Sequence, residues 1–318
     1  MSHLIRSILL RIRALISRNR EKKENIIISL SGEDVQYEII RLLQSEKPCM
    51  IARFGSVELQ SVIDYLYPSS FRNIIPFLRY KIPSWGYSPS TIKTMHINAG
   101  FFPSTPRELN KFGKLMIDCI KCVDLLGSWR PEEKYVKSYL EDKTIVPLAD
   151  LEPYYFDEPW TIALQGKKVL VIHPFEDSIK KQYSNIDKLF NNKKLTPKYQ
   201  LITIKAVQSI AGNKPDGFST WFDALEHMKA EIDKVDFDIA IIGCGAYGFP
   251  LAAYVKQIGK KAIHLGGAVQ YLFGIKSNAG NNTIKLPKLY NEFWIYPSRS
   301  ETPRGIENVE NSRYWNIL

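Results

Sequence analysis

Residues 236–274 read DFDIAIIGCGAYGFPLAAYVKQIGKKAIHLGGAVQYLFG, and they decide the fold of this chain. The continuous apolar run FDIAIIGC (237–244) predicts a buried strand, and a glycine-rich turn then leads into a helix over 249–259. The run KKAIHLG (260–266) predicts a second strand. Two strands joined by a helix of this length pair in parallel through a right-handed crossover. The segment therefore predicts an α/β fold with a parallel sheet.

The same alternation extends toward the N-terminus. The predicted strands are CMIARF (49–54), GKKVLVIHP (166–174) and YQLITIKA (199–206), and the predicted helices are 32–47, 56–66, 107–126, 176–190, 220–235 and 268–275. We therefore predict a Rossmann-like parallel sheet flanked by helices in a single domain over 25–318. The segment 68–106, rich in Pro, Ser, Gly and aromatic residues, is expected to be a binding loop. The tail from Lys276 onward lacks periodicity and is expected to form an irregular C-terminal strap.

The composition is that of an ordinary globular protein, with 45% hydrophobic and 24% charged residues. The formal net charge of +10 favours anionic partners such as nucleic acid, lipid head groups or phosphorylated substrates. The cysteines lie mostly in apolar runs, which indicates a reducing compartment. Cys119 and Cys122 have CxxC spacing, but the sequence offers no second pair and no nearby His, so we expect no zinc site.

The N-terminal residues 3–20, HLIRSILLRIRALISRNR, predict a helix that lies on a membrane. Arginines interrupt every apolar run, which excludes a signal peptide and a spanning helix. At helical spacing, Leu and Ile form one stripe bordered by arginines, among them Arg6 and Arg13. Arginine can reach lipid phosphates while such a stripe lies below the head groups. We expect residues 4–20 to bind an anionic membrane surface, with 1–24 as helix and linker, and the protein to be cytoplasmic and peripheral at the inner face of the cell membrane. Packing of the stripe on the protein or on a second subunit is the alternative.

Ligands of open α/β sheets bind at the carboxyl ends of the strands, so the residues after each predicted strand are the candidates for a site. The turn GCGAYG (243–248) has GxGxxG spacing, in which backbone N–H groups approach a phosphate at a helix N-terminus. Glycines that only permit tight helix–sheet packing are the alternative. NAD is disfavoured because the next strand ends in His264 and glycines instead of an acidic residue. The predicted ligand-binding residues are Gly55, Ser56, Lys205, Gln208, Gly243, Gly245, Tyr247, Gly248, His264, Gly266 and Gly267.

Three segments, 236–274, IARFGSVEL (51–59) and GKKVLVIHP (166–174), resemble the GT-D-type bacterial glycosyltransferases. The resemblance implies a nucleotide-sugar donor, commonly a UDP-sugar, and Mn²⁺ or Mg²⁺ held by an Asp-x-Glu pair. The corresponding positions here are Ser56-Val57-Glu58, so Glu58 alone is carried over as a metal ligand. As an enzyme of the hexosyltransferase type, the protein is expected to transfer a sugar to a surface-polysaccharide or lipid-linked glycan acceptor.

Sugar transfer needs charge stabilisation on the departing diphosphate and a general base for the acceptor hydroxyl. We expect Glu58 and Glu176 to be catalytic carboxylates, and Arg53, aided by Lys205, to neutralise the diphosphate. For Glu176, a simple helix-start charge is the alternative. Further side chains of suitable chemistry are His173 and Asp223 for acid–base work, and Trp85, Tyr87 and Trp221 for stacking on a base or sugar.

Other functions are compatible with parts of the pattern. A SAM-dependent methyltransferase also has a glycine-rich turn after a strand, although that strand usually opens the fold, whereas here it lies near the end. A non-catalytic scaffold protein of polysaccharide synthesis would explain the missing motif Asp at Ser56. We expect no nucleic-acid partner, because the basic excess is concentrated in the N-terminal helix and the chain has no groove-reading motif.

Overall fold

A single parallel sheet forms the centre of the protein in the computed structural model, which describes residues 2–16, 26–310 and 312–315. Its strand order is β3-β2-β1-β7-β6-β4-β5, and every neighbouring pair is parallel. The strands are β1 (Cys49–Arg53), β2 (Leu125–Ser128), β3 (Thr144–Pro147), β4 (Lys168–His173), β5 (Gln200–Lys205), β6 (Ile239–Ile242) and β7 (Lys261–His264). Because all of them point the same way, their carboxyl ends share one edge of the sheet.

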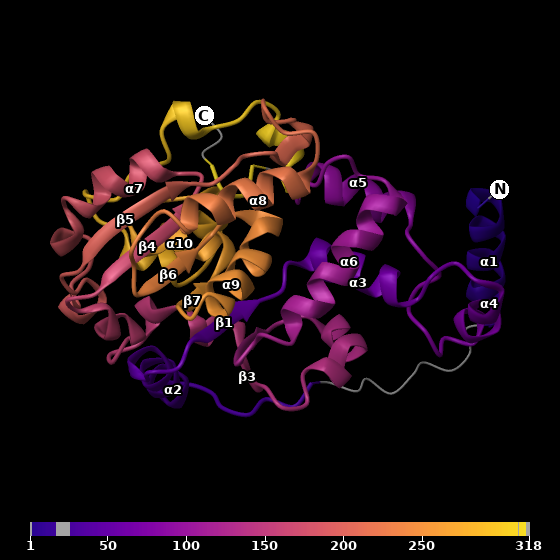
Figure 1. Cartoon of the computed structure of the whole chain (residues 1–318), viewed down its shortest axis with the longest axis horizontal. Coiled ribbons are helices and arrows are strands. Elements are labelled where there is room, and N and C mark those ends of the chain that lie inside the picture. The colour runs from indigo at the N-terminus through magenta and orange to yellow at the C-terminus, as the bar shows by residue number, and fades with distance from the viewer. Residues whose placement is uncertain (1, 17–25, 311, 316–318) are drawn as a thin grey trace.

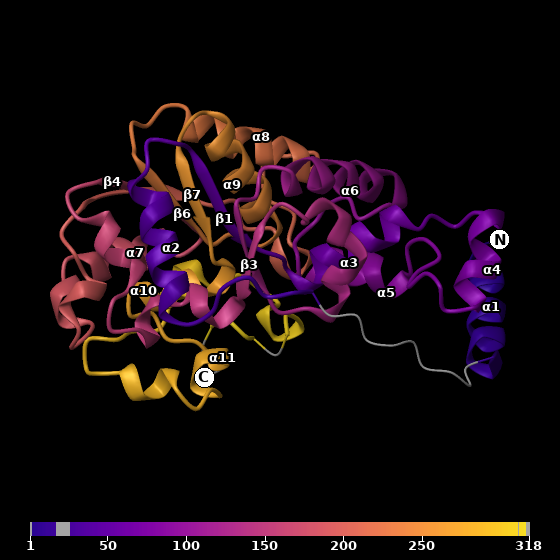
Figure 2. The ribbon, with the colours of Figure 1, turned by 90° about the horizontal axis from the view of Figure 1, so that it is seen from below.

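Helices cover both faces of this sheet (Figures 1 and 2). Figure 2 shows α8 and α9 on one side of the strands, and α2, α7 and α10 on the other. The α-helices are α1 (Ser2–Ile16), α2 (Glu33–Gln44), α3 (Ser56–Leu66), α4 (Phe71–Leu78), α5 (Pro89–Ile97), α6 (Pro106–Ile120), α7 (Glu176–Tyr183), α8 (Trp221–Ile232), α9 (Gly248–Gln257), α10 (Val269–Leu272) and α11 (Asn278–Asn281).

Alternate residues of each central strand enter two separate hydrophobic cores. In β1, Met50 and Ala52 pack in the core under α3, α6, α8 and α9, whereas Cys49 and Ile51 pack in the core on the opposite face. A strand buried on both faces has no polar alternation, which explains the continuous apolar runs of the sequence. The predicted Rossmann-like α/β fold is thus confirmed.

Two strands differ from the prediction. The predicted helix over 107–126 is wrong beyond Ile120, because the chain turns there and enters β2 at Leu125. Neither β2 nor β3 was predicted, since a strand of four residues is too short for a periodic signal.

The segment 68–106 also contains more regular structure than expected, because α4 and α5 lie within it. Its prolines do not exclude these helices. Pro89 occupies the first turn of α5, where a missing N–H costs nothing, and Ser88 caps that helix by accepting a hydrogen bond from the Thr91 N–H at 2.9 Å. The stretch is therefore partly helical.

The described parts of the two chain ends contain the predicted N-terminal helix and the predicted irregular C-terminal tail. The N-terminal helix α1 is present, and residues 17–25, which include the end of the predicted membrane segment and its linker, lie outside the described residues. Within the described ranges, no helix is both long and apolar enough to span a bilayer. The C-terminal strap is mostly irregular, and Trp294 and Trp315 bury it against the body with 3% and 2% of their surface exposed.

Candidate functional site

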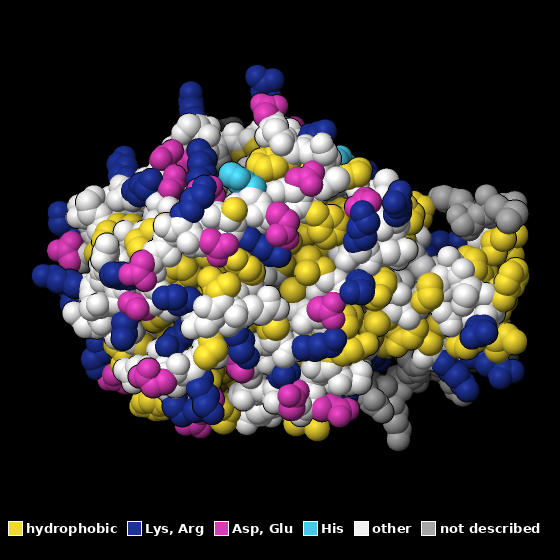
Figure 3. Space-filling model, in the orientation of Figure 1, with side chains coloured by type: hydrophobic (Ala, Val, Ile, Leu, Met, Phe, Trp, Pro, Cys, Tyr) yellow, Lys and Arg dark blue, Asp and Glu magenta, His cyan; other side chains and the backbone are white. Residues whose placement is uncertain are grey.

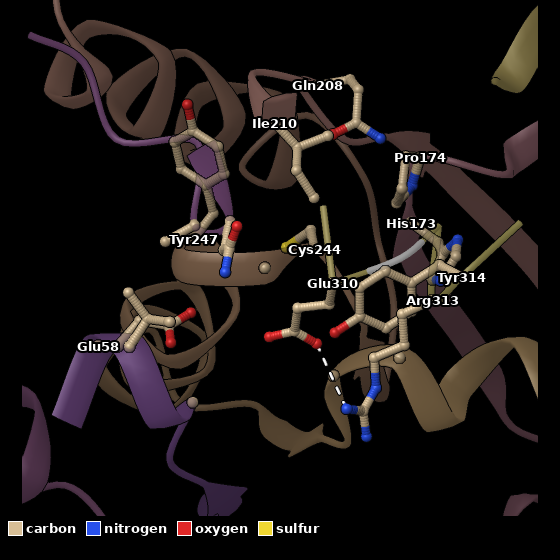
Figure 4. A pocket seen from close by; sticks show the side chains of 18 of the residues that line it. Glu58, His173, Pro174, Gln208, Ile210, Cys244, Tyr247, Glu310, Arg313 and Tyr314 are labelled. Atoms are coloured by element: carbon tan, nitrogen blue, oxygen red, sulfur yellow. Dashed lines mark hydrogen bonds and ion pairs between the residues drawn. The ribbon is translucent and has the colours of Figure 1, made fainter. Parts of the chain in front are cut away.

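A cavity lies at the carboxyl edge of the sheet, where the turns after β1, β2, β4, β5, β6 and β7 meet the C-terminal strap (Figure 4). Of the residues predicted from the sequence, those that line it are Arg53, Gly55, Ser56, Glu58, His173, Gln208, Gly243, Gly245, Tyr247, His264, Gly266 and Gly267. The turns Arg53–Glu58 and Gly243–Gly248 therefore border one cavity, although nearly 190 residues separate them in the sequence.

Glu58 stands in the first turn of α3, and its carboxylate folds back over Gly55. A Cβ on Gly55 would lie only 1.8 Å from Glu58 Oε2, so this position of the carboxylate requires glycine at the helix cap. Burial raises the pKa of Glu58, while the nearby Arg53 acts to lower it. The site thus holds a carboxylate of increased basicity beside the positive end of a helix.

The Arg53 side chain lines the cavity and lies near Glu58. Burial lowers its pKa, but arginine remains charged in proteins. Its Cζ lies 5.0 Å from the centre of the Trp129 ring, and Trp129 is held in turn by a 2.9 Å hydrogen bond from its Nε1 to the Phe54 carbonyl. A fixed, desolvated cation of this kind suits an anionic ligand.

His173, at the end of β4, lines the cavity as a neutral imidazole. Burial lowers its pKa to about 3. Its Nδ1 accepts a hydrogen bond from the Phe175 N–H at 3.0 Å, which leaves the proton on Nε2. The ring packs against Gly243, where a Cβ would approach His173 Cδ2 to 2.8 Å and the Gly266 carbonyl oxygen to 2.6 Å. This glycine is required for the close approach of the β4, β6 and β7 turns.

The turn after β6 contributes side chains that pack inside the protein and also line the cavity. Tyr247 stacks on Trp221 with ring centroids 4.7 Å apart, and its hydroxyl lies 3.1 Å from the Ser209 hydroxyl. Burial raises the pKa of Cys244, so this cavity-lining thiol stays protonated and is not a nucleophile. Trp221 itself serves as packing under Tyr247 and does not line the cavity.

Three predicted residues do not line the cavity. The lysine at the end of the edge strand, Lys205, is exposed. At the start of α9, Gly248 faces His264, and a Cβ there would lie 2.2 Å from the imidazole Cε1. This glycine therefore serves helix–sheet packing, the alternative that the sequence left open.

Glu176 is the third, and its surroundings explain its position. It accepts a 2.6 Å hydrogen bond from the Thr203 hydroxyl and pairs with Lys180 at 3.0 Å. Burial acts to raise the pKa of Glu176, but these two partners outweigh it and the pKa is lowered. The N-terminus of α7, the helix that begins with Glu176, is occupied by the carboxylate of Glu301, which accepts a hydrogen bond from the N–H of Asp177 at 2.9 Å.

The remaining candidates lie elsewhere in the fold. Asp223 forms a capping box with Thr220 at the start of α8, with 2.7 Å between the Thr220 nitrogen and Asp223 Oδ2. Trp85 and Tyr87 belong to the region of α4 and α5 and do not line this cavity.

The strap contributes residues that the sequence did not identify. Glu310, Arg313 and Tyr314 line the cavity, and Arg313 Nη1 lies 3.3 Å from Glu310 Oε2 (Figure 4). Burial raises the pKa of Tyr314 to about 12, so its hydroxyl is a donor at neutral pH. Trp129 was missed as well, because the strand before it was not recognised. The tail carries no local signal that could have placed Arg313 at a site.

The donor set does not form a complete metal cage. Among the described residues, no cluster of three or more His, Cys, Asp or Glu side chains has the arrangement to hold a metal ion. Glu58 is joined in the cavity wall by Ser56 and by the cation Arg53, and a resident divalent ion needs more oxygen ligands than these supply. Metal dependence remains a prediction.

The arrangement joins the partly buried cation Arg53, the exposed cation Arg313, a helix N-terminus, neutral donors and one basic carboxylate at a single edge, which suits a phosphorylated ligand. Comparison with protein-family models, with curated proteins and with solved structures finds no match to this chain.

Proposed function

We propose that this protein is a glycosyltransferase that moves a sugar from a nucleotide-sugar donor, a UDP-sugar by resemblance, to a surface-polysaccharide or lipid-linked glycan acceptor. One observation carries the proposal: the turns after β1 and β6, which bear the motif resemblance, border the same cavity. The partly buried cation Arg53 and the N-terminus of α3 lie at this cavity, and both suit a diphosphate. The proposal includes association with an anionic membrane on the cytoplasmic side through residues 4–20.

In the proposed reaction, the Glu58 carboxylate takes the proton of the acceptor hydroxyl. The acceptor oxygen forms a bond to the anomeric carbon, and the bond from that carbon to the diphosphate oxygen breaks. The electron pair leaves with the nucleoside diphosphate. Arg53, Arg313 and the N-terminus of α3 stabilise its charge. The raised pKa of Glu58 makes it a stronger base than a solvated carboxylate.

The test is a screen of nucleotide sugars that measures released nucleoside diphosphate, with and without Mn²⁺. For the donor that is turned over, Glu58→Ala should lower the rate at least about 100-fold, the usual contribution of a general base. Glu176→Gln is the matched control, because both glutamates open a helix after a strand but only Glu58 lines the cavity. Its rate should stay within about twofold of wild type.

Three outcomes would count against the proposal. Equal rates for wild type and Glu58→Ala would remove Glu58 from the reaction. Turnover of no donor, together with thermal stabilisation by S-adenosylmethionine and not by UDP, would favour the methyltransferase alternative. Stabilisation by neither ligand would favour the scaffold role.

A further inference from the structure

Helices α1 and α4 form a two-helix unit at the end of the molecule opposite the sheet (Figures 1 and 2). Leu9 of α1 is buried, with 7% of its surface exposed, in a small core with Phe77 of α4 and Trp85. This core is separate from the two cores of the sheet. The unit is therefore held by its own packing.

Two arginines that the sequence placed beside the apolar stripe face the body instead. Arg6 donates to the carbonyl oxygens of Trp85 at 2.7 Å and Gly86 at 2.8 Å. The Arg13 guanidinium lies 4.1 Å from the ring centre of Phe77 and 4.2 Å from that of Tyr80. These side chains fix α1 onto α4 and the segment after it, and so orient the opposite face of α1 outward.

That outward face is apolar, and α4 extends it. Hydrophobic side chains line the outer edge of this end of the molecule (Figure 3). On α4, Phe71 is 92% exposed and Ile75, one turn later, is 60% exposed. Of the exposed apolar residues of α1, Ile5, Ile8, Ile12, Leu15 and Ile16 follow helical spacing along one face, whereas Leu10 lies off that face. So many large apolar side chains on adjacent helices mark an interaction surface.

The charge around this surface identifies its partner. Helix α1 and residues 71–81 together contain six Lys and Arg and no Asp or Glu. Arg72, Arg79 and Lys81 are exposed on or next to α4. A second copy of the chain would bring equal positive charges together, which disfavours self-association. An anionic bilayer matches both the charge and the apolar face.

We propose that α1 and α4 together form a membrane-docking platform, in which Phe71, Ile75 and Leu15 enter the acyl layer of an anionic bilayer while the basic residues contact lipid phosphates. The platform includes a second helix, α4, in addition to the N-terminal segment that the sequence indicated. The proposal is independent of the reaction at the sheet edge, because docking requires neither a donor nor an acceptor.

The experiment is cosedimentation of the full chain with phosphatidylcholine vesicles, with and without phosphatidylglycerol. We expect binding only when phosphatidylglycerol is present, and weaker binding at high salt. The double variant Phe71→Ser/Ile75→Ser should lower the partition coefficient at least about tenfold, since two apolar side chains leave the bilayer. Ile284→Ser is the matched control, because Ile284 is 85% exposed but lies far from the platform in the C-terminal strap. Its binding should equal that of wild type.

Each of the other possible results would contradict a specific part of the docking proposal. If the wild-type protein does not bind vesicles that contain phosphatidylglycerol, the proposed membrane-docking platform is wrong. If Phe71→Ser/Ile75→Ser binds as wild type while Ile12→Ser/Leu15→Ser does not, α4 has no part in docking. A wild-type dimer that the α4 variant converts to a monomer would assign the surface to self-association. Unchanged unfolding transitions of the variants show that α4 remains folded, and the nucleotide screen reports separately on the sheet-edge cavity.

Discussion

The turns after β1 and β4 have the same local sequence pattern, but the glutamate that follows each turn has different surroundings. Each strand passes through a short turn into a helix with glutamate in the first turn, Glu58 in α3 and Glu176 in α7. At α3 the carboxylate faces the cavity over Gly55, whereas at α7 it turns onto Thr203 of β5. The N-terminus of α7 already holds an anion, the carboxylate of Glu301. In this fold, the glutamate after a strand and a turn faces the cavity at the helix whose N-terminus is not occupied by a carboxylate from another part of the chain.

The largest effect expected from this comparison comes from the β1 turn. Gly55→Ala should lower kcat/KM about 100-fold, because the added Cβ displaces the Glu58 carboxylate from its place. The backbone at Gly55, with φ −72° and ψ 144°, accepts alanine, so the variant should fold. Release of nucleoside diphosphate measures the effect.

Lys205→Ala is the control for this prediction, because Lys205 ends a strand of the same sheet but is exposed outside the cavity. It should leave kcat/KM within about twofold of wild type. A Gly55→Ala enzyme with wild-type kcat/KM would show that the position of Glu58 over Gly55 has no role in turnover.

A substitution at the turn after β4 should lower the stability of the protein instead of its turnover. Glu301 accepts hydrogen bonds from the N–H groups of Asp177 at 2.9 Å and Ser178 at 3.1 Å, and from the Ser178 hydroxyl. Glu301→Gln places an amide donor among these donors and removes the charge at the helix end. The free energy of unfolding in urea should fall by about 2 kcal/mol at neutral pH. Glu307→Gln, an exposed position in the same strap, should change it by less than about 0.5 kcal/mol. Equal loss in both variants would mean that the cap on α7 is not the cause.

The smallest expected effect is a pH dependence of stability that starts at the same two turns. Burial holds the pKa of His173 at about 3, below the ordinary value of about 6.5. Between these values the unfolded chain binds a proton that the folded chain does not, so stability is lost as the pH falls from about 6.5. The contribution is about 1.4 kcal/mol per pH unit, and His264 adds a second of the same sign. Buried carboxylates with raised pKa, such as Glu58, act in the opposite direction, at more acidic pH.

His173→Asn tests this dependence, because the Asn oxygen can still accept the hydrogen bond from the Phe175 N–H. Urea unfolding between about pH 6.5 and pH 5 should show a mean slope smaller by about 1 kcal/mol per pH unit than in wild type, because the unfolded histidine is only partly protonated near its pKa. His227→Asn, at an exposed position of α8, serves as the control. An unchanged slope in His173→Asn would mean that His173 takes up a proton in the folded protein.

Much of the fold could be predicted because strands buried on both faces leave continuous apolar runs. Helix α3 begins and ends at the residues predicted for it, and β1, β4, β5, β6 and β7 lie within their predicted runs. The short strands β2 and β3 were not predicted, since four residues give no periodic signal. The loss of β2 also hid Trp129, which follows it and stacks on Arg53.

The candidate site was predictable on the side formed by strand ends. Arg53, Glu58 and the β6 turn follow recognisable strands, and parallel strands bring their ends to one edge. Arg313 and Tyr314 were not predictable, because they come from an irregular tail whose position depends on long-range contacts. The Trp315 indole, for example, donates to the Glu301 carbonyl at 3.2 Å.

The order of apolar runs and glycines along the chain was enough to specify a parallel α/β sheet, an amphipathic N-terminal helix and the sheet edge at which the cavity lies, because these properties follow from local periodicity. Which glutamate faces the cavity, which helix end is already capped and which arginines hold α1 to α4 were settled by tertiary contacts alone. The reason is physical: a side chain takes its role from the partners that long-range packing brings to it, and no local pattern encodes those partners.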